Sequence, residues 1–167
     1  MGKSVGNGVI MFKVRLITVG KIKEKYFSEA VEEYAKRLKR FCDFSIIEVK
    51  EENFVKEPDF KEAERIKRAE GENILKELRG KTVVFAIEGK ECSSEEFAAL
   101  IKGVKDGAGE ISFVIGGSYG VSDEVKKRAD YKISFSEMTF PHAMFRVMCI
   151  EQIYRGFTII SGAKYHK

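Results

Sequence analysis

The sequence predicts an α/β fold built on a mainly parallel sheet with helices on both faces. Short apolar runs with strand character alternate along the chain with longer runs of helical periodicity, which is the pattern of such folds. Two of the strands, Thr82–Ile87 and Ile111–Ile115, are apolar almost throughout, as expected for strands covered on both sides. The chain has 167 residues, which suits one domain with a substantial core.

Hydrophobic periodicity and end signals place the other elements. Ser93 and Glu96 have the spacing of a capping box, and Ser122 stands before two acidic residues that suit the first turn of a short helix. Pro141 is typical of a first helical turn, and Gly162 follows the last apolar residues of that final helix. We therefore expect further strands at Phe12–Val19, Phe44–Val49 and Tyr131–Ser134, helices at Tyr26–Arg40, at Lys61–Leu78, from Ser93 to Lys105 and from Pro141 to Ile160, and a charged loop at Glu51–Phe60.

The composition is that of an ordinary globular protein. Hydrophobic residues make up 44% of the chain and charged residues 34%, and the net charge of +4 permits a basic face for nucleic acid without requiring one. Cys42, Cys92 and Cys149 are scattered without the spacing of metal ligands, so we expect reduced thiols and no metal. No signal peptide and no apolar stretch of membrane-spanning length is recognised. These features favour a cytoplasmic protein that does not enter a membrane.

The first ten residues show no pattern of a helix or a strand. Gly2-Lys3-Ser4 resembles the end of a phosphate-binding loop, but the preceding strand and the spaced glycine are missing. We expect residues 1–10 to be an N-terminal extension, disordered or foreign to the native protein. The folded domain is expected to span residues 11–167.

A glycine-rich segment follows the strand Ile111–Ile115. The run Gly116–Gly120 lacks the second glycine of a dinucleotide-binding motif and the Lys-Ser/Thr pair of a phosphate loop. It has two interpretations: a tight turn that uses the freedom of glycine at positive φ, or a bare backbone edge that a flat ligand can approach closely. Ligands of parallel sheets bind at the carboxyl ends of strands, and this segment begins at such an end.

A second unusual loop, Ser134–His142, follows the last strand and leads into the final helix. It contains two Phe and one Met, although loops are usually polar. Phe135, Met138 and Phe140 either fill the core or enclose an apolar ligand. In the second case, backbone groups of the loop would hydrogen-bond the polar edge of that ligand.

The final helix has apolar residues nearly all round, which indicates burial in the protein or against a partner. His142 and Arg146 are four residues apart on one face, and Glu151 and Arg155 share another. Glu151 and Arg155 either form a plain intrahelical ion pair or belong to an interface helix that borders a charged site. Residues 162–167, with their Tyr-His pair, are either a frayed tail or a segment that closes over an anionic, aromatic substrate.

Several segments form a combination that is far more specific than any one of them. They are Val14–Lys25, Phe113–Gly120, Ser134–His142, Glu151–Phe157 and the terminal pair Tyr165-His166. Together they resemble the RlmH family of SPOUT methyltransferases, whose members modify a pseudouridine in large-subunit ribosomal RNA. The similarity runs from Met11 to the end of the chain.

The resemblance implies a compact α/β domain whose C-terminal segment is threaded as a trefoil knot, a rare exception to the rule against knotted chains. It implies S-adenosylmethionine as the cofactor, held by the knot loops. The family also uses an apolar residue at the end of Thr82–Ile87. This segment is one residue shorter here, and we assign the contact to Ala86, with Phe85 as the alternative. The cofactor-binding residues implied by position are Ala86, Gly116, Phe135, Ser136, Glu137, Met138, Thr139 and Phe140.

The resemblance further implies a homodimer, with the final helix in the interface, that acts on N3 of a pseudouridine of 23S rRNA in the assembled 70S ribosome. Because N3 must lose its proton, we expect Arg155 to stabilise the anion and His166 to accept the proton. Tyr165 is expected to orient the base and Glu151 to position Arg155, and His142 is a weaker candidate base. The expected phosphate contacts are Lys21, Lys23, Lys25, Arg146, Lys164 and Lys167.

Two rival functions remain open at this point. One is a nucleotide-binding or phosphate-binding α/β enzyme that uses the glycine-rich segment. The other is a non-catalytic ribosome-binding factor that keeps the fold. Binding of S-adenosylmethionine would exclude the first, and methyl transfer to ribosomes would exclude the second.

Overall fold

The computed structural model describes residues 11–107 and 109–165, and the extension expected at residues 1–10 lies outside them. The strands are β1 (Lys13–Val19), β2 (Asp43–Val49), β3 (Lys81–Glu91), β4 (Glu110–Ile115) and β5 (Tyr131–Ser134). They form one sheet with the order β2-β1-β4-β3-β5, in which every neighbouring pair is parallel. The expected α/β fold with a parallel sheet is confirmed.

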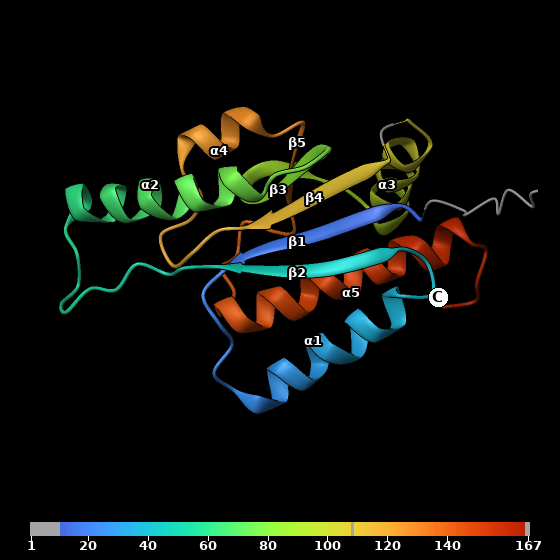
Figure 1. Ribbon diagram of the computed structural model, residues 1–167, viewed down its shortest axis with the longest axis horizontal. Coiled ribbons are helices and arrows are strands. Elements are labelled where there is room, and N and C mark those ends of the chain that lie inside the picture. Colours follow the sequence, from blue (N-terminus) through green and yellow to red (C-terminus); the bar gives the residue numbers. More distant parts are fainter. Residues whose placement is uncertain (1–10, 108, 166–167) are drawn as a thin grey trace, which may run out of the picture.

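Helices cover both faces of this sheet. They are α1 (Lys25–Leu38), α2 (Phe60–Glu77), α3 (Ser94–Gly107), α4 (Asp123–Arg128) and α5 (His142–Ile160). One face is covered by α1, α3 and α5, and the other by α2 and α4 (Figure 1). The final helix α5 packs against both α1 and α3, which explains why its sequence is apolar nearly all round.

The two faces of the sheet pack against two separate cores. On β4, the side chains of Ile111, Phe113 and Ile115 belong to the core beneath α1, α3 and α5, and Val114 belongs to the core beneath α2 and α4. This alternation follows from the two-residue repeat of a strand. All four side chains are buried, and burying each contributes about 1.5–3 kcal/mol to stability.

Side-chain caps begin two of the helices where the sequence predicts them. The backbone N–H of Ser93 donates to Glu96 Oε2 (2.7 Å), and the N–H of Glu96 donates to Ser93 Oγ (3.1 Å), which is the expected capping box. Ser122 accepts from the N–H of Val125 (3.4 Å) and begins α4. Each cap satisfies an N–H group that has no partner inside its helix.

Strand β3 is longer than predicted. The sequence predicts a strand that stops at Ile87, but β3 continues to Glu91, with a shift in its pairing to β5 between Phe85 and Lys90. Gly89 lies within this irregular stretch, and a Cβ atom there would lie 2.7 Å from the backbone of Ile133. A glycine therefore permits the close approach of the two strands, while residues 86–88 bulge away from the ladder.

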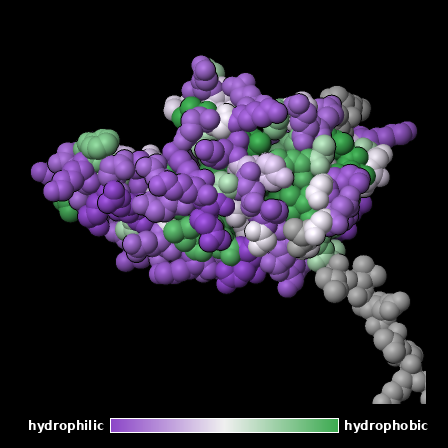
Figure 2. All heavy atoms as spheres, turned by 90° about the horizontal axis from the view of Figure 1, so that it is seen from above, coloured by the Kyte–Doolittle hydropathy of each residue, from purple (hydrophilic) through white to green (hydrophobic). Residues whose placement is uncertain are grey.

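The surface is predominantly hydrophilic in the view from above, with an apolar area toward the α3 end of the molecule (Figure 2). Within residues 11–107 and 109–165, we find no helix with both the length and the apolar composition needed to cross a membrane.

Candidate cofactor and active site

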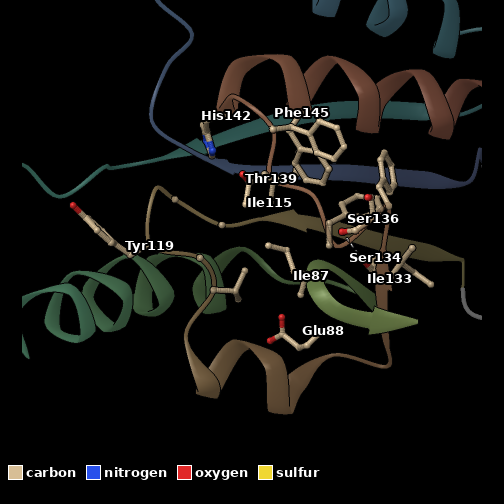
Figure 3. A pocket seen from close by; sticks show the side chains of 18 of the residues that line it. Ile87, Glu88, Ile115, Tyr119, Ile133, Ser134, Ser136, Thr139, His142 and Phe145 are labelled. Carbon is tan, nitrogen blue, oxygen red and sulfur yellow. Dashed lines mark hydrogen bonds between the residues drawn. The ribbon is translucent and has the colours of Figure 1, made fainter. Parts of the chain in front are cut away.

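A cavity of about 640 Å³ lies at the carboxyl ends of three neighbouring strands. Its lining comes from residues 85–88 at the bulge of β3, residues 115–121 at and after the end of β4, and residues 133–136, 138–140 and 142 at and after the end of β5, together with Lys126 and Phe145. In Figure 3, His142 and Phe145 lie on one side of this space and Glu88 on the opposite side. The size and position are typical of a site for a small molecule in an α/β fold.

The glycine-rich segment forms a tight turn that also lines the cavity. The N–H of Gly120 donates to the carbonyl of Gly117 (3.0 Å), and Gly120 has a φ of +89°, in the region that glycine tolerates best. A Cβ atom on Gly116 would lie 2.7 Å from the backbone of Gly120. The interpretation as a tight turn is confirmed, and the same turn presents bare backbone to the cavity; the approach of a flat ligand stays a prediction.

The second loop likewise combines the two interpretations. The ring of Phe135 meets Phe85 (5.4 Å between centres) and Phe145 (5.2 Å) edge to face, and Phe140 stacks on Phe145 (6.0 Å). All four rings also line the cavity. Met138 is 72% exposed, so the interpretation in which it fills the core is wrong.

Ser136 fixes the shape of this loop. Its backbone carbonyl accepts a hydrogen bond from Ser134 Oγ (3.2 Å), and its own Oγ accepts one from the N–H of Met138 (3.0 Å). Hydroxyl groups that bond nearby backbone in this way satisfy N–H and C=O groups of a loop that has no helical or strand hydrogen bonds.

The cavity brings together most of the residues proposed for cofactor binding. Glu137 is the exception, because it is exposed and outside the lining. Ala86 and Phe85 both line the cavity, but the ring of Phe85 is 4% exposed and stacks on Phe113, so Ala86 faces the space more freely. The residues that line it are Ala86, Gly116, Phe135, Ser136, Met138, Thr139 and Phe140.

Two charged residues of the lining were not predicted from the sequence. Glu88 at the bulge of β3 and Lys126 on α4 form an ion pair at the wall of the cavity. The hydrogen bond from Lys126 lowers the pKa of Glu88, so this carboxylate stays ionised near neutral pH, paired with the ammonium group of Lys126. A surface Glu and Lys separated by 38 positions give no pattern in sequence, and only the fold reveals the pair.

Arg146 was expected to contact RNA phosphates, and this prediction is wrong for the described structure. Its side chain is 3% exposed and its guanidinium donates to Glu48 Oε2 (2.9 Å) and to the carbonyls of Val19 (3.1 Å) and Gly20 (3.0 Å). Arg146 therefore ties the start of α5 to the ends of β1 and β2. Its burial leaves no route to a phosphate.

His142 lies in the lining, beside Arg146. Burial lowers the pKa of His142, and the charge of Arg146 lowers it further, against a hydrogen bond with the backbone of Val19. Its Nε2 atom is buried and finds no partner among the described residues. A neutral imidazole at this position is the form that could accept a proton.

The proposed catalytic residues form a second cluster near the other end of α5. Arg155 donates from Nε (3.0 Å) and Nη2 (2.6 Å) to Glu151 Oε1, and Tyr165 Oη donates to the same oxygen (3.3 Å). Burial and a hydrogen bond with Tyr34 raise the pKa of Tyr165 to about 12, so this hydroxyl stays protonated. The expected pairing of Glu151 with Arg155 is confirmed, whereas His166 lies outside the described residues.

This catalytic cluster is remote from the cavity of its own chain. Arg155 follows His142 by 13 positions on one helix, which corresponds to about 20 Å at 1.5 Å per residue. None of Glu151, Arg155 and Tyr165 belongs to the cavity lining.

The proposed RNA-binding lysines lie in two places. Lys21 and Lys23 are exposed on the loop after β1, which Arg146 holds against the start of α5, and Lys25 is exposed at the first position of α1. Lys164 is exposed beside the catalytic cluster, and Lys167 lies outside the described residues.

Metal and thiol chemistry find little support in the described part of the chain. Residues 11–107 and 109–165 contain no group of three His, Cys, Asp or Glu side chains placed to hold a metal ion. Burial raises the pKa of the Cys42 thiol to about 12 and that of Cys149 well above its ordinary value. Cys92 is half-exposed, and partial burial raises its pKa as well.

Comparison with known proteins shows the family of this chain. Residues 12–166 match the family described as "Predicted SPOUT methyltransferase". The chain belongs to the SPOUT methyltransferases and, within them, to the RlmH family.

The relatives that show this membership are ribosomal RNA large subunit methyltransferases H. The protein of Clostridium acetobutylicum is 51% identical over 158 residues, with 92% of this chain and 99% of the relative covered. The protein of Caldicellulosiruptor saccharolyticus is 52% identical over 156 residues, with the same coverage. A solved methyltransferase of Legionella pneumophila with bound SAM is similar with a TM-score of 0.47 and 11% identity, over 86% of this chain and 66% of that chain.

Proposed function

We propose that this protein is an S-adenosylmethionine-dependent methyltransferase that modifies N3 of a pseudouridine in 23S rRNA. In this proposal it acts as a homodimer in the cytoplasm, on the assembled 70S ribosome. The observation that supports the proposal best is the cavity between the loops after β3, β4 and β5. It occurs in a chain that shares about half of its residues with ribosomal RNA large subunit methyltransferases.

The lining of the cavity suits an adenosyl donor. A purine needs flat apolar walls and backbone groups at its edge, and Ile115, Phe140 and the bare Gly116 backbone offer both. The carboxylate of Glu88 adds an acceptor for a hydroxyl or a cationic group. When bound, S-adenosylmethionine would supply a methyl group already activated on a sulfonium. The protein must therefore supply binding, orientation and a deprotonated nitrogen.

The cluster at the end of α5 is suited to activate the nitrogen. N3–H of pseudouridine lies between two carbonyl groups, and the anion formed by its deprotonation needs a nearby cation. Arg155 would stabilise that anion while Glu151 holds the guanidinium in place. Tyr165, which keeps its proton, would orient the base, and His166 would take the N3 proton.

The distance between the two clusters favours a dimer. An incompletely buried stripe on α5, Met144, Met148, Glu151 and Arg155, runs from the edge of the cavity to the catalytic cluster. If two copies pair antiparallel along this stripe, Arg155 of the partner subunit comes near the cavity. The proposed reaction then uses a donor from one subunit and activating residues from the other. Such a self-complementary contact is the common form of a two-fold dimer.

We also infer that the C-terminal segment is knotted. The loops 115–121 and 133–142 border the same cavity, and the chain then crosses from α4 on one face of the sheet to α5 on the other. This path is compatible with a C-terminal segment threaded through an earlier loop.

The test is methyl transfer from labelled S-adenosylmethionine to ribosomes that lack the modification, followed by nucleoside mass spectrometry. The expected product is 3-methylpseudouridine in 23S rRNA of 70S particles. Donor binding without any transfer would favour the non-catalytic ribosome-binding factor, and the absence of donor binding in calorimetry would favour the nucleotide- or phosphate-binding enzyme.

A further inference from the structure

Glu70 on α2 is a buried carboxyl group that the proposed reaction does not use. It is 3% exposed, its Oε1 atom accepts a hydrogen bond from the N–H of Glu52 (3.1 Å), and its Oε2 atom is buried without a hydrogen-bond partner among the described residues. Burial raises the pKa of Glu70, and the neighbouring carboxylates of Glu51 and Glu52 raise it further, against the hydrogen bond from Glu52. An incompletely paired buried carboxyl group costs stability, so its presence here calls for a reason.

The unpaired side of this carboxyl group lies directly against the glycine-rich turn of the cavity. A Cβ atom on Gly117 would lie 3.1 Å from Cδ and 3.2 Å from Oε1 of Glu70, and closer still to Oε2. The φ of Gly117 is not positive, so a side chain there would not strain the backbone but would require the carboxyl end of Glu70 to move. Gly117 lines the cavity, whereas Glu70 does not.

Glu70 also joins the two loops that follow β2 and β4. It accepts from Glu52 in the first loop and supports Gly117 in the second. The same loops meet again farther out, where the rings of Phe54 and Tyr119 lie 5.6 Å apart and Tyr119 Oη donates to Glu57 (3.3 Å). Tyr119, like Gly117, lines the cavity, so both contacts reach the site.

The next residue of α2 forms a similar contact. A Cβ atom on Gly71 would lie 2.9 Å from Cβ of Ser122, the residue that caps α4 just after the turn. Glu70 and Gly71 on α2 thus pack against Gly117 and Ser122, at the two ends of the segment 117–122. A turn held from beneath in this way keeps its backbone in place when a ligand approaches from the other side.

We propose that Glu70 is a positioning residue for the methyl donor: its carboxyl group supports Gly117 and fixes the backbone edge that the donor contacts. This inference rests on the proposed function, since it assumes that an adenosyl donor occupies the cavity. The role depends on the size and polarity of the group. The side chain of Gln, which has the same shape, should therefore replace it.

The test combines a variant that enlarges residue 117 with one that shortens residue 70. Binding of S-adenosylmethionine is measured by calorimetry. Gly117→Ala should raise the Kd at least about tenfold, because the new methyl group pushes the turn off Glu70. Glu70→Ala should also raise the Kd. Glu70→Ala combined with Gly117→Ala should bind at least about threefold more tightly than Gly117→Ala alone, because the vacated space accepts the methyl group. Glu70→Gln should bind within about threefold of the unaltered protein.

The matched controls are Glu72→Ala and Glu72→Gln, at an exposed site on the same helix, which should leave the Kd unchanged. Thermal melts separate loss of binding from loss of fold. If Glu70→Ala does not fold, Glu70→Asp, which withdraws the carboxyl group by one methylene, takes its place in the double variant.

Three results would overturn the inference: unchanged binding by Gly117→Ala, additive losses in the double variant, or equal losses for Glu70→Gln and Glu70→Ala. If the unaltered protein does not bind the donor at all, the proposed function is wrong and the inference falls with it. If the unaltered protein binds and the variants behave additively, only the role of Glu70 is wrong.

Discussion

The guanidinium carbon of Arg155 lies 4.8 Å from the ring centre of Tyr165, and both side chains hydrogen-bond the same carboxylate oxygen of Glu151. Arg155 on α5 and Tyr165 in the segment after it thus meet at one oxygen atom of Glu151. The hydrogen bonds that Arg155 donates to Glu151 raise the pKa of Arg155, so the cation is permanent at any physiological pH. A fixed cation beside a fixed phenol is a suitable arrangement for a flat, anionic base.

Arg155→Ala is therefore expected to slow methyl transfer by about 100-fold or more, because the developing N3 anion loses its cation. Donor affinity should change by less than about twofold, since Arg155 does not line the cavity of its own chain and, in the proposed dimer, faces the base rather than the donor. Single-turnover transfer to ribosomes and calorimetry measure the two quantities. Arg37→Ala is the matched control, because Arg37 on α1 also pairs with a Glu four positions away and lies over a tyrosine ring. Transfer at the normal rate by Arg155→Ala would refute the assignment.

A dimer whose two subunits share each site predicts complementation between inactive variants. Gly116→Ala should abolish donor binding, because its Cβ atom would lie 2.7 Å from the backbone of Gly120, and Arg155→Ala should bind the donor without transferring its methyl group. After the two proteins are mixed and allowed to exchange subunits, heterodimers hold one intact site each. Random exchange should restore about a quarter of the normal activity. If each site is built from one chain, the mixture stays inactive.

The charge of Glu88 should distinguish the donor from its product. S-adenosylmethionine carries a sulfonium charge that S-adenosylhomocysteine lacks, so Glu88→Gln removes an attraction felt only by the former. We expect about a threefold loss of affinity for the donor and a smaller one for the product, as is typical of a partly exposed pair. Competition binding with both ligands measures the difference, and Glu124→Gln, at an exposed site on α4, is the control. Equal losses for the two ligands would contradict this role.

The burial of His142 predicts a pH dependence of stability. Because burial lowers the pKa of His142 in the folded protein, the unfolded chain binds the proton more tightly. The contribution of neutral His142 to the free energy of unfolding is thus fully present above the ordinary histidine pKa of about 6.5. It decreases as the pH falls below that value. Urea unfolding between pH 7.5 and 5.5 should show this slope, and His142→Asn should reduce it. His166→Asn, which alters the other histidine, is the control; an unchanged slope for His142→Asn would show that another group titrates.

Local signals in the sequence were sufficient where structure depends on neighbouring residues. The capping box of Ser93 and Glu96 involves positions three apart, and both unusual loops were recognised because glycines or aromatics followed a strand. The extension of β3 to Glu91 was missed, because Glu88-Gly89-Lys90 has the composition of a turn. Its pairing with Ile133 depends on another strand and not on its own residues.

The order of strands and helices and the place of the cavity at the strand ends could thus be derived from the sequence, since periodicity and capping act within a few positions. The burial of Arg146, the Glu88–Lys126 pair and the support of Gly117 by Glu70 were decided only by the tertiary structure. These contacts join residues far apart in the chain, 126 positions in the case of Arg146 and Gly20. The helical repeat predicts which residues share a face of a helix, but only tertiary packing determines which other residues that face contacts.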